Sequence, residues 1–324
     1  MFESAGSNEC LDTTVLTMDA PADVSGPSSR STLRLPRLGE AFDSYRIVTI
    51  LGCGGMGVVT LVHDEREGSL LATKFLDPDH ARDPEMVRRF RRETDLLGRC
   101  RHSNVVEFRD AGEFEGLPWL AMEYVRGRPL ASGSGARRSN PREVAEVGLQ
   151  VARALDHLHT RGIVHRDVKP ANIVVERNAD RPPRAVLVDF GLAQATGSEA
   201  DHLDGGISGT PLYMPPEQLD PAAAADPRSD LYALGATLLD LLGERPVATL
   251  RQFLETRVAA CPRRRPVDAK LLPGVPLELQ HLLDRLVQPD PADRPPTARS
   301  VATSLDRFLN GRDATVRCSR ASLA

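Results

Sequence analysis

Two short apolar segments near the middle of the chain each adjoin side chains suited to binding phosphate and metal ions. The sequence His165-Arg166-Asp167-Val168-Lys169-Pro170-Ala171-Asn172 precedes one valine-rich run, and Asp189-Phe190-Gly191 follows the next. Both apolar runs have strand composition. Their ends can therefore deliver Asp167, Asn172 and Asp189 to one cleft, and the fold has to accommodate that arrangement. Such a set of residues suits the transfer of a phosphoryl group to a hydroxyl.

The distribution of lysine supports the same chemistry. Only three of the 41 basic residues are lysine, namely Lys74, Lys169 and Lys270. Lysine is a compact point charge on a slim stem, whereas arginine is a rigid planar fork. Two of the three lysines lie in or near motifs where a phosphate would be met in a confined space.

Length and composition exclude several classes of protein. With 324 residues, 41% of them hydrophobic, the chain can bury a substantial core in one or two domains. The net charge of −4 shows no bias toward nucleic acid or anionic membranes. The five scattered cysteines indicate a reducing compartment rather than a disulfide framework. The N-terminus does not resemble a secretory signal, and no apolar run approaches the roughly 20 residues of a membrane span. We therefore expect a cytoplasmic protein without a transmembrane segment.

Composition divides the chain into an N-terminal extension, a folded domain and a short tail. Residues 1–41 are rich in Ser, Thr, Pro, Gly and Asp without periodicity, and we expect disorder there. Residues 42–310 are expected to fold, and residues 311–324 to form a frayed tail. The first part of the domain, 42–125, is expected to be mostly β-sheet with one long helix over 84–97. Its expected strands are 45–51, 58–62, 70–76, 105–110 and 118–125.

The second part of the domain, 126–310, changes to helical patterns. Residues 127–140 are rich in Gly, Ser and Arg and are expected to form a loop or a poor helix. Residues 141–160 form an amphipathic pattern, with Asn140 as the expected cap and Pro141 in the first turn. Helical patterns then dominate over 216–309. The prediction is an α+β fold with two lobes, one small and β-rich and one larger and mainly helical.

A glycine-rich segment, Gly52-Cys53-Gly54-Gly55-Met56-Gly57, lies between two expected strands. A dinucleotide-binding fingerprint would instead lead from a strand into a helix. The remaining interpretations are a flexible loop over phosphates and an ordinary glycine hairpin. Lys74 on the following strand and Glu93 on the helix favour the first, because a semi-buried lysine needs an acidic partner.

Together these motifs resemble those of the eukaryotic-type serine/threonine protein kinases, and their residues most resemble those of the bacterial members of that family. The resemblance extends from about Tyr45 to about Leu309. It implies transfer of the γ-phosphoryl group of ATP to Ser or Thr hydroxyls of protein substrates, including the chain itself. It also implies a divalent metal ion, Mg²⁺, with Mn²⁺ as an alternative.

The resemblance assigns a role to each matching position. Lys74 would hold the α- and β-phosphates and pair with Glu93, Asp167 would accept or orient the substrate hydroxyl, and Asn172 and Asp189 would hold the metal. Lys169 would meet the transferred phosphate, as in the serine/threonine branch, and Thr210 would hydrogen-bond toward Asp167 and Lys169. The nucleotide pocket would comprise Leu51, Gly52, Cys53, Gly54, Gly55, Met56, Gly57, Val59, Ala72, Lys74, Met122, Glu123, Val125 and Val174.

Other matching positions imply structural and regulatory roles. Glu217 is expected to pair with Arg294, and Asp230 to support the catalytic loop. Arg166 is expected to meet a phosphate on the activation loop, 192–209. That loop offers Thr196, Ser198 and Ser208. Asp201 or Asp204 could instead replace a phosphate there, and a solvated acidic loop is the alternative.

Two other functions remain open at this point. One is a catalytically silent ATP-binding scaffold, which would normally lack the lysine, the catalytic-loop aspartate or the metal aspartate, all of which this chain retains. The other is a small-molecule kinase, which the segment from Thr210 to Glu217 argues against because it resembles a platform for a polypeptide. We expect protein substrates, no nucleic-acid partner, and a homodimer as one route to activation in trans.

Overall fold

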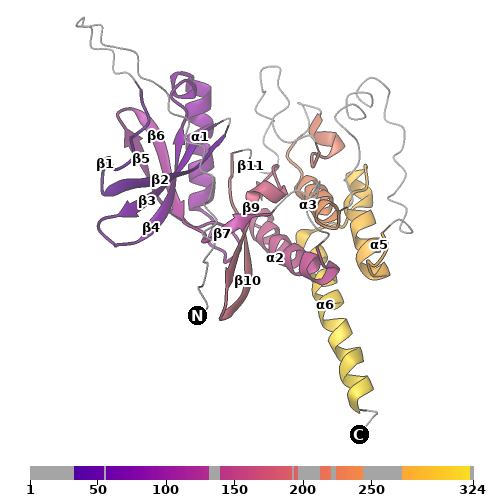
Figure 1. The fold of residues 1–324 in the computed structure, drawn as a ribbon. Coiled ribbons are helices and arrows are strands. Elements are labelled where there is room, and N and C mark those ends of the chain that lie inside the picture. The colour runs from indigo at the N-terminus through magenta and orange to yellow at the C-terminus, as the bar shows by residue number, and fades with distance from the viewer. Residues whose placement is uncertain are drawn as a thin grey trace, which may run out of the picture. The chain divides into compact units, whose positions relative to one another are not determined.

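The computed structural model describes residues 33–54, 56–130, 139–191, 193–195, 212–219, 224–243 and 272–321 of the chain. Within three of these ranges, the side chains of residues 195, 219 and 312–321 are not described. All of the described residues belong to one structural unit, Leu33–Ala324. The described residues contain both lobes that the sequence predicts, a β-sheet lobe and a mainly helical lobe (Figure 1).

The first lobe is a six-stranded antiparallel sheet with the strand order β1-β2-β3-β4-β6-β5. Alternating apolar residues explain its buried face, where the rings of Phe42, Tyr45, Phe75 and Trp119 pack edge to face or tilted. Gly112 is required beside Trp119, because a Cβ atom there would lie 2.6 Å from the indole ring. The strands are β1 (Ala41–Phe42), β2 (Tyr45–Gly54), β3 (Gly57–Asp64), β4 (Leu70–Leu76), β5 (Phe108–Phe114) and β6 (Leu117–Glu123).

Helix α1 (Pro84–Gly98) follows the short 3₁₀ helix η1 (His80–Arg82). Asp83 caps α1 by accepting a hydrogen bond from the Glu85 backbone N–H, and Pro84 occupies the first turn. Its buried face carries Phe90, Leu96 and Leu97 and also one charged residue, Glu93. The helix therefore delivers a carboxylate into an otherwise apolar contact.

The second lobe is built on α2 (Pro141–His159) and α3 (Pro227–Leu241). As predicted, Asn140 caps α2 by accepting from the Arg142 backbone N–H. Helix α3 is buried along almost its whole length, whereas α2 buries one apolar face. Figure 1 shows α6 (Ala298–Ala321) running past α2, and α5 (Leu277–Leu286) lies against α3. The short 3₁₀ helices η3 (Pro216–Leu219) and η5 (Pro291–Asp293) flank these helices.

Two small sheets lie on the side of the helical lobe that carries the motifs. Strands β7 (Gly127–Pro129), β9 (Ile173–Asn178) and β10 (Arg181–Leu187) form one sheet in the order β10-β9-β7. Strand β8 (Ile163–Val164) pairs with β11 (Gln194–Ala195) to form the other. The 3₁₀ helix η2 (Pro170–Asn172) leads directly into β9.

Three elements differ most from the sequence predictions. Gly127–Pro129 forms a strand rather than a loop, because β9 supplies its partners although the residues lack apolar alternation. Strand β5 begins at Phe108 instead of Val105, and Val105 forms an isolated bridge to Leu187 in the core. Helix α6 continues to Ala321, through most of the tail predicted over 311–324, because arginine and alanine there are good helix formers.

Residues 33–40 precede the domain start expected at residue 42, and they contact the sheet. Arg34 donates to both Glu40 carboxylate oxygens at 2.9 and 2.8 Å and lies over the Phe114 ring. The Gly39 backbone N–H donates to Ile47 O at 2.9 Å. These contacts are mostly polar, so hydrophobic periodicity did not reveal them. Among the described residues, no helix is long and apolar enough to cross a membrane.

Candidate active site

The segment between β8 and β9 carries the motif His165–Asn172, and one buried carboxylate holds its backbone in place. Asp230 on α3 accepts the backbone N–H groups of His165 at 2.9 Å and Arg166 at 2.7 Å. It also contacts His159 Nε2 at 2.8 Å. Burial alone would raise the pKa of Asp230, but the hydrogen bond and charge of His159 outweigh it, and the pKa is lowered. The predicted supporting role of Asp230 agrees with these contacts.

The backbone of this loop is strained at Arg166, which has a φ of +64°. The two hydrogen bonds to Asp230 hold that conformation. The Arg166 guanidinium donates to the Gln194 side-chain oxygen on β11. His165 is fully buried, and its ring centroid lies 5.1 Å from that of Phe190, so the two rings pack against each other in the core.

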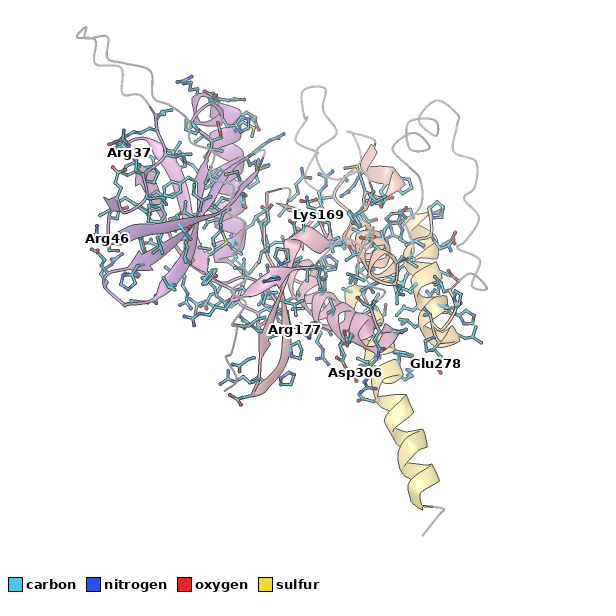
Figure 2. The ribbon with its side chains drawn as sticks, in the orientation of Figure 1. Arg37, Arg46, Lys169, Arg177, Glu278 and Asp306 are labelled. Carbon is cyan, nitrogen blue, oxygen red and sulfur yellow. The ribbon has the colours of Figure 1, made fainter. Side chains whose placement is uncertain are left out.

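Asp167, Lys169 and Asn172 converge on one carboxylate. Lys169 Nζ donates to Asp167 Oδ2 at 2.8 Å. Asn172 Nδ2 donates to the same oxygen at 2.8 Å and to the Asp167 backbone oxygen at 2.9 Å. The amide nitrogen of Asn172 therefore faces Asp167, which leaves its amide oxygen as the atom that can bind a cation. Figure 2 shows Lys169 on this segment, between the larger sheet and the helices.

Lys74 on β4 forms ion pairs with two carboxylates, Glu93 of the first lobe and Asp189 of the second. Its Nζ atom lies 2.9 and 3.0 Å from the Glu93 oxygens and 2.9 Å from Asp189 Oδ1. Burial by itself would lower the pKa of Lys74, but the charges of Glu93 and Asp189 raise it. The ammonium group is therefore charged at neutral pH, as a contact with phosphate requires.

Burial and the charges within the group Lys74, Glu93 and Asp189 also shift the pKa values of the two carboxyl groups. Burial raises the pKa of Glu93 despite the charge of Lys74, and the nearby Asp189 charge adds to the increase. Burial would also raise the pKa of Asp189, but Lys74 outweighs it and lowers that pKa to about 2. Asp189 is thus ionised near neutral pH and can bind a cation. The backbone N–H of Phe190 donates to Glu93 Oε1 at 3.3 Å, which ties α1 to this segment.

Strands β9 and β10 bring the two motifs together, as the sequence predicts. The Val188 backbone N–H, just after β10, donates to the Asn172 backbone oxygen, just before β9, at 2.9 Å. The carboxylate of Asp189 and the amide oxygen of Asn172 are the hard oxygen donors that Mg²⁺ prefers. The donor set therefore fits a divalent cation held together with phosphate and water. No group of three or more His, Cys, Asp or Glu side chains that could hold a metal occurs in the part of the chain that the structure describes.

The glycine-rich segment forms the hairpin between β2 and β3, with Gly54 paired to Gly57. Gly57 has a φ of +149°, and a Cβ atom there would lie 1.9 Å from the Phe75 backbone oxygen, so only glycine fits. The Met56 side chain lies beside Gly191, since a Cβ atom on Gly191 would lie 3.0 Å from Met56 Sδ. The hairpin therefore contacts the segment Asp189–Gly191. Gly55 lies outside the described residues.

The residues expected in the nucleotide pocket come from strands β2, β3, β4, β6 and β9 and from the link after β6. Ala72 lies opposite Met122 across the β4–β6 pair, and Val59 lies opposite Lys74 across the β3–β4 pair. Five of the apolar candidates belong to one buried cluster or pack against it. That cluster contains Ala72, Met122 and Val125, with Val59 and Val174 packed against it. Leu51 and the neighbouring residues Gly52, Cys53 and Gly54 on β2 are exposed. Glu123 ends β6, and its backbone N–H donates to Glu107 O at 2.9 Å.

A protein kinase domain model matches residues 45–305 of the chain. The chain belongs to the protein kinase family. The family resemblance and the two-lobed fold predicted from the sequence are therefore confirmed.

Bacterial relatives are similar to this kinase chain over most of its length. The serine/threonine-protein kinase PknJ of Mycobacterium tuberculosis is 39% identical over 212 residues, which are 65% of this chain and 36% of the relative. Pkn1 of Myxococcus xanthus is 36% identical over 260 residues, which are 80% of this chain and 37% of the relative. The chain thus spans well under half the length of these relatives.

Solved structures support the same family. The kinase domain of PknI from Mycobacterium tuberculosis has a TM-score of 0.63 and 32% identity to this chain, covering 84% of this chain and 99% of the solved domain. A second crystal structure of that domain also has a TM-score of 0.63, with 31% identity over 86% of this chain.

Some predicted residues lie outside the described part of the kinase, and some contacts were not predicted. Thr210, Thr196, Ser198, Ser208, Asp201 and Asp204 lie outside the described residues. The pairing of Glu217 with Arg294 agrees with the prediction, at 2.6 and 2.8 Å. Gln194 beside Arg166, and Arg184 beside Glu123, were missed. Each is a single polar residue whose partner is distant in sequence, and neither belongs to a motif.

Proposed function

We propose that this chain is an ATP- and Mg²⁺-dependent protein kinase that transfers the γ-phosphoryl group to serine and threonine hydroxyls of proteins, including its own. One observation carries the proposal: Lys74, Glu93 and Asp189 form one ion-paired group, and Asp167, Lys169 and Asn172 form another on adjoining strand ends. Phosphoryl transfer depends mainly on positioning and charge neutralisation, which these two groups can supply.

Each group has a distinct part in the proposed reaction. The substrate oxygen forms a bond to the γ-phosphorus, the bond to the bridging oxygen of ADP breaks, and the hydroxyl proton passes to Asp167. Lys169 lies beside Asp167 and would meet the transferred phosphate, while Lys74 would hold the α- and β-phosphates. Asn172 and Asp189 would hold the divalent cation, which when bound neutralises charge on the phosphate oxygens.

The finer parts of the proposal rest on the family and on the residues in the site. Serine and threonine specificity is supported by Lys169 and by the names of the bacterial relatives. We extend it to a cytoplasmic protein, with residues 1–41 as an extension of a kinase domain spanning 42–310 and a tail of 311–324. Protein substrates, activation in trans by a second copy and the absence of a nucleic-acid partner belong to the same proposal.

The test is autophosphorylation with labelled ATP and Mg²⁺, comparing the unaltered chain with Asp167→Ala and Lys74→Ala. Label on serine or threonine that both substitutions abolish is the expected result. A matched control is Asp306→Asn on α6, whose carboxylate forms an exposed pair with Arg153 and lies away from the site (Figure 2). ATP binding without any transfer to the chain or to a general protein substrate would favour the silent scaffold instead.

A further inference from the structure

The Arg184 side chain on β10 contacts three separate segments of the described chain. Its Nε donates to Glu176 Oε2 on β9 at 2.9 Å, and its Nη2 donates to the Glu123 carboxylate at the end of β6. Its Nη1 reaches the Ser103 backbone oxygen at 3.4 Å. A planar guanidinium can make such contacts at once because its donors are fixed in a fork.

Glu123 begins the link between the two lobes. It is paired with Leu71 on β4, and its backbone N–H donates to Glu107 O at 2.9 Å. The family resemblance places Glu123 and Val125 in the nucleotide pocket, and we take their backbones as the contacts for the adenine edge. A side-chain bond from Arg184 therefore acts on the residue whose backbone position sets where adenine can bind.

The other end of the link is held by the same hairpin. Gly127 begins β7 and pairs with Glu176 on β9, the residue that also accepts from Arg184. A Cβ atom at Gly127 would lie 2.4 Å from the Val175 backbone oxygen, so the close approach of β7 to β9 requires glycine. The Gly127 backbone N–H donates to Val125 O at 2.8 Å, which makes the link a tight turn. The β9–β10 hairpin thus holds residues 123–127 at both ends.

We propose that Arg184 is a positioning residue for ATP: it fixes the link 123–127 against the β9–β10 hairpin so that the link backbone is already placed for adenine. A backbone ordered before binding spares the ligand the entropic cost of ordering it. The inference rests on the proposed function, because it requires ATP as the bound nucleotide. It concerns nucleotide affinity, since Arg184 contacts none of the residues that act on the γ-phosphate.

We expect the fold to tolerate loss of the Arg184 guanidinium, so that a substitution there can test the proposal. Its side chain is 31% exposed, and β9 and β10 pair through their own backbones from Arg184 to Leu187. The neighbouring Ala185 N–H is held separately by Gln150 Oε1 at 2.8 Å. Loss of the guanidinium should therefore loosen the link without removing the hairpin.

The experiment measures kcat and the KM for ATP in Arg184→Gln, Arg184→Lys and the control Arg177→Gln, which changes an exposed arginine in the same hairpin (Figure 2). We expect Arg184→Gln to raise the KM for ATP about tenfold, equivalent to about 1.4 kcal/mol, with kcat within about twofold of the unaltered chain. Arg184→Lys should recover only part of the affinity, because lysine lacks the fork. Arg177→Gln should match the unaltered chain.

A double-substitution cycle with Glu123→Gln separates positioning from general loss of stability. If Arg184 acts through Glu123, the two KM effects will not add, and the thermal midpoints of both variants will not track their KM values. A KM for ATP in Arg184→Gln that stays within twofold of the unaltered chain overturns the proposal. So does a loss confined to kcat, or KM effects of the pair that add in full. Lys74→Ala reports separately on the site: activity that survives it refutes the proposed function, whatever Arg184 does.

Discussion

Lys74 Nζ lies 2.9 Å from Asp189 Oδ1, so the lysine assigned to phosphate and the aspartate assigned to metal form a direct ion pair. The lysine is buried, whereas the aspartate side chain is 43% exposed. Glu93 holds the lysine from the other side at 2.9 Å. In the proposed complex, the phosphates would bind at Lys74 and the cation at Asp189, two groups that already lie next to each other. Glu93 would keep its ion pair with Lys74 when Asp189 binds the cation.

This arrangement predicts that Asp189→Asn abolishes transfer but preserves nucleotide binding. The substitution removes the carboxylate that binds the cation, so we expect the rate of transfer to fall by at least about 10²-fold. Lys74 keeps its ion pair with Glu93, so affinity for ATP should change little. The measurement is single-turnover transfer alongside ATP binding by calorimetry. Transfer at a tenth of the normal rate or better would show that Asp189 does not hold the cation.

Lys169→Arg tests whether the site needs a point charge in a confined space. Lys169 Nζ contacts Asp167 Oδ2 at 2.8 Å, and Asn172 donates to the same oxygen at 2.8 Å. A guanidinium preserves the charge but is planar and bulkier, so we expect kcat to fall by roughly tenfold or more while the KM for ATP holds. Steady-state kinetics with a fixed protein substrate would measure the split. A kcat equal to that of the unaltered chain would mean that charge alone suffices.

The sequence predicted the fold well where local pattern and tertiary packing agree. Strand 70–76 and the helices beginning at Pro84 and Pro141 match the structure because apolar periodicity, caps and prolines all point the same way. The prediction was wrong for Gly127–Pro129, whose pairing depends on β9 rather than on its own composition. The prediction of a frayed tail from residue 311 was also wrong as far as Ala321, because composition there gives no stop signal apart from Gly311.

The site residues could be predicted for a different reason. Asp167, Asn172 and Asp189 are defined by motif spacing, and the structure brings them to adjoining strand ends. Arg184 and Gln194 lie in no motif, and each bonds a residue at least 28 positions away. One sequence contains no periodic signal for such pairs. Contacts of this kind become visible only once the chain is folded.

The Glu217–Arg294 pair should be a main determinant of stability in the helical lobe. The Arg294 side chain is fully buried, donates to both Glu217 oxygens and to the Gln288 backbone oxygen, and lies 4.9 Å from the Tyr232 ring centroid. Glu217→Gln leaves a buried guanidinium without its counter-charge, so we expect a loss of about 3–5 kcal/mol in the free energy of unfolding. Urea unfolding measures it.

The matched control for that loss is Arg299→Gln. Arg299 pairs with Asp156 at 3.0 Å, but its side chain is 72% exposed. An exposed pair contributes at most about 1 kcal/mol. Equal losses in Glu217→Gln and Arg299→Gln would contradict the assignment of Glu217–Arg294 as a buried structural pair.

Three histidines should make the folded state less stable as the pH falls below neutral. Burial lowers the pKa of His165, and it also lowers those of His102 and His157, with nearby arginines adding to the effect. Three ring nitrogens accept backbone hydrogen bonds: His102 Nδ1 from Asn104 at 3.1 Å, His157 Nε2 from Arg101 at 3.3 Å and His165 Nδ1 from Asp167 at 3.3 Å. Protonation at any of these atoms would turn that acceptor into a donor and break the bond.

The sign follows from proton binding in the two states. Each histidine has a folded pKa below its ordinary value of 6.5, so between those values the unfolded chain binds more protons than the folded chain. The stabilising contribution is complete above 6.5 and is lost as the pH falls through the folded pKa. The thermal midpoint should therefore decrease from about pH 7 to about pH 5, and His102→Gln with His157→Gln should make that decrease shallower. The exposed His281→Gln serves as the control and should leave the slope unchanged. An equally steep decrease in the double variant would assign the effect to other groups.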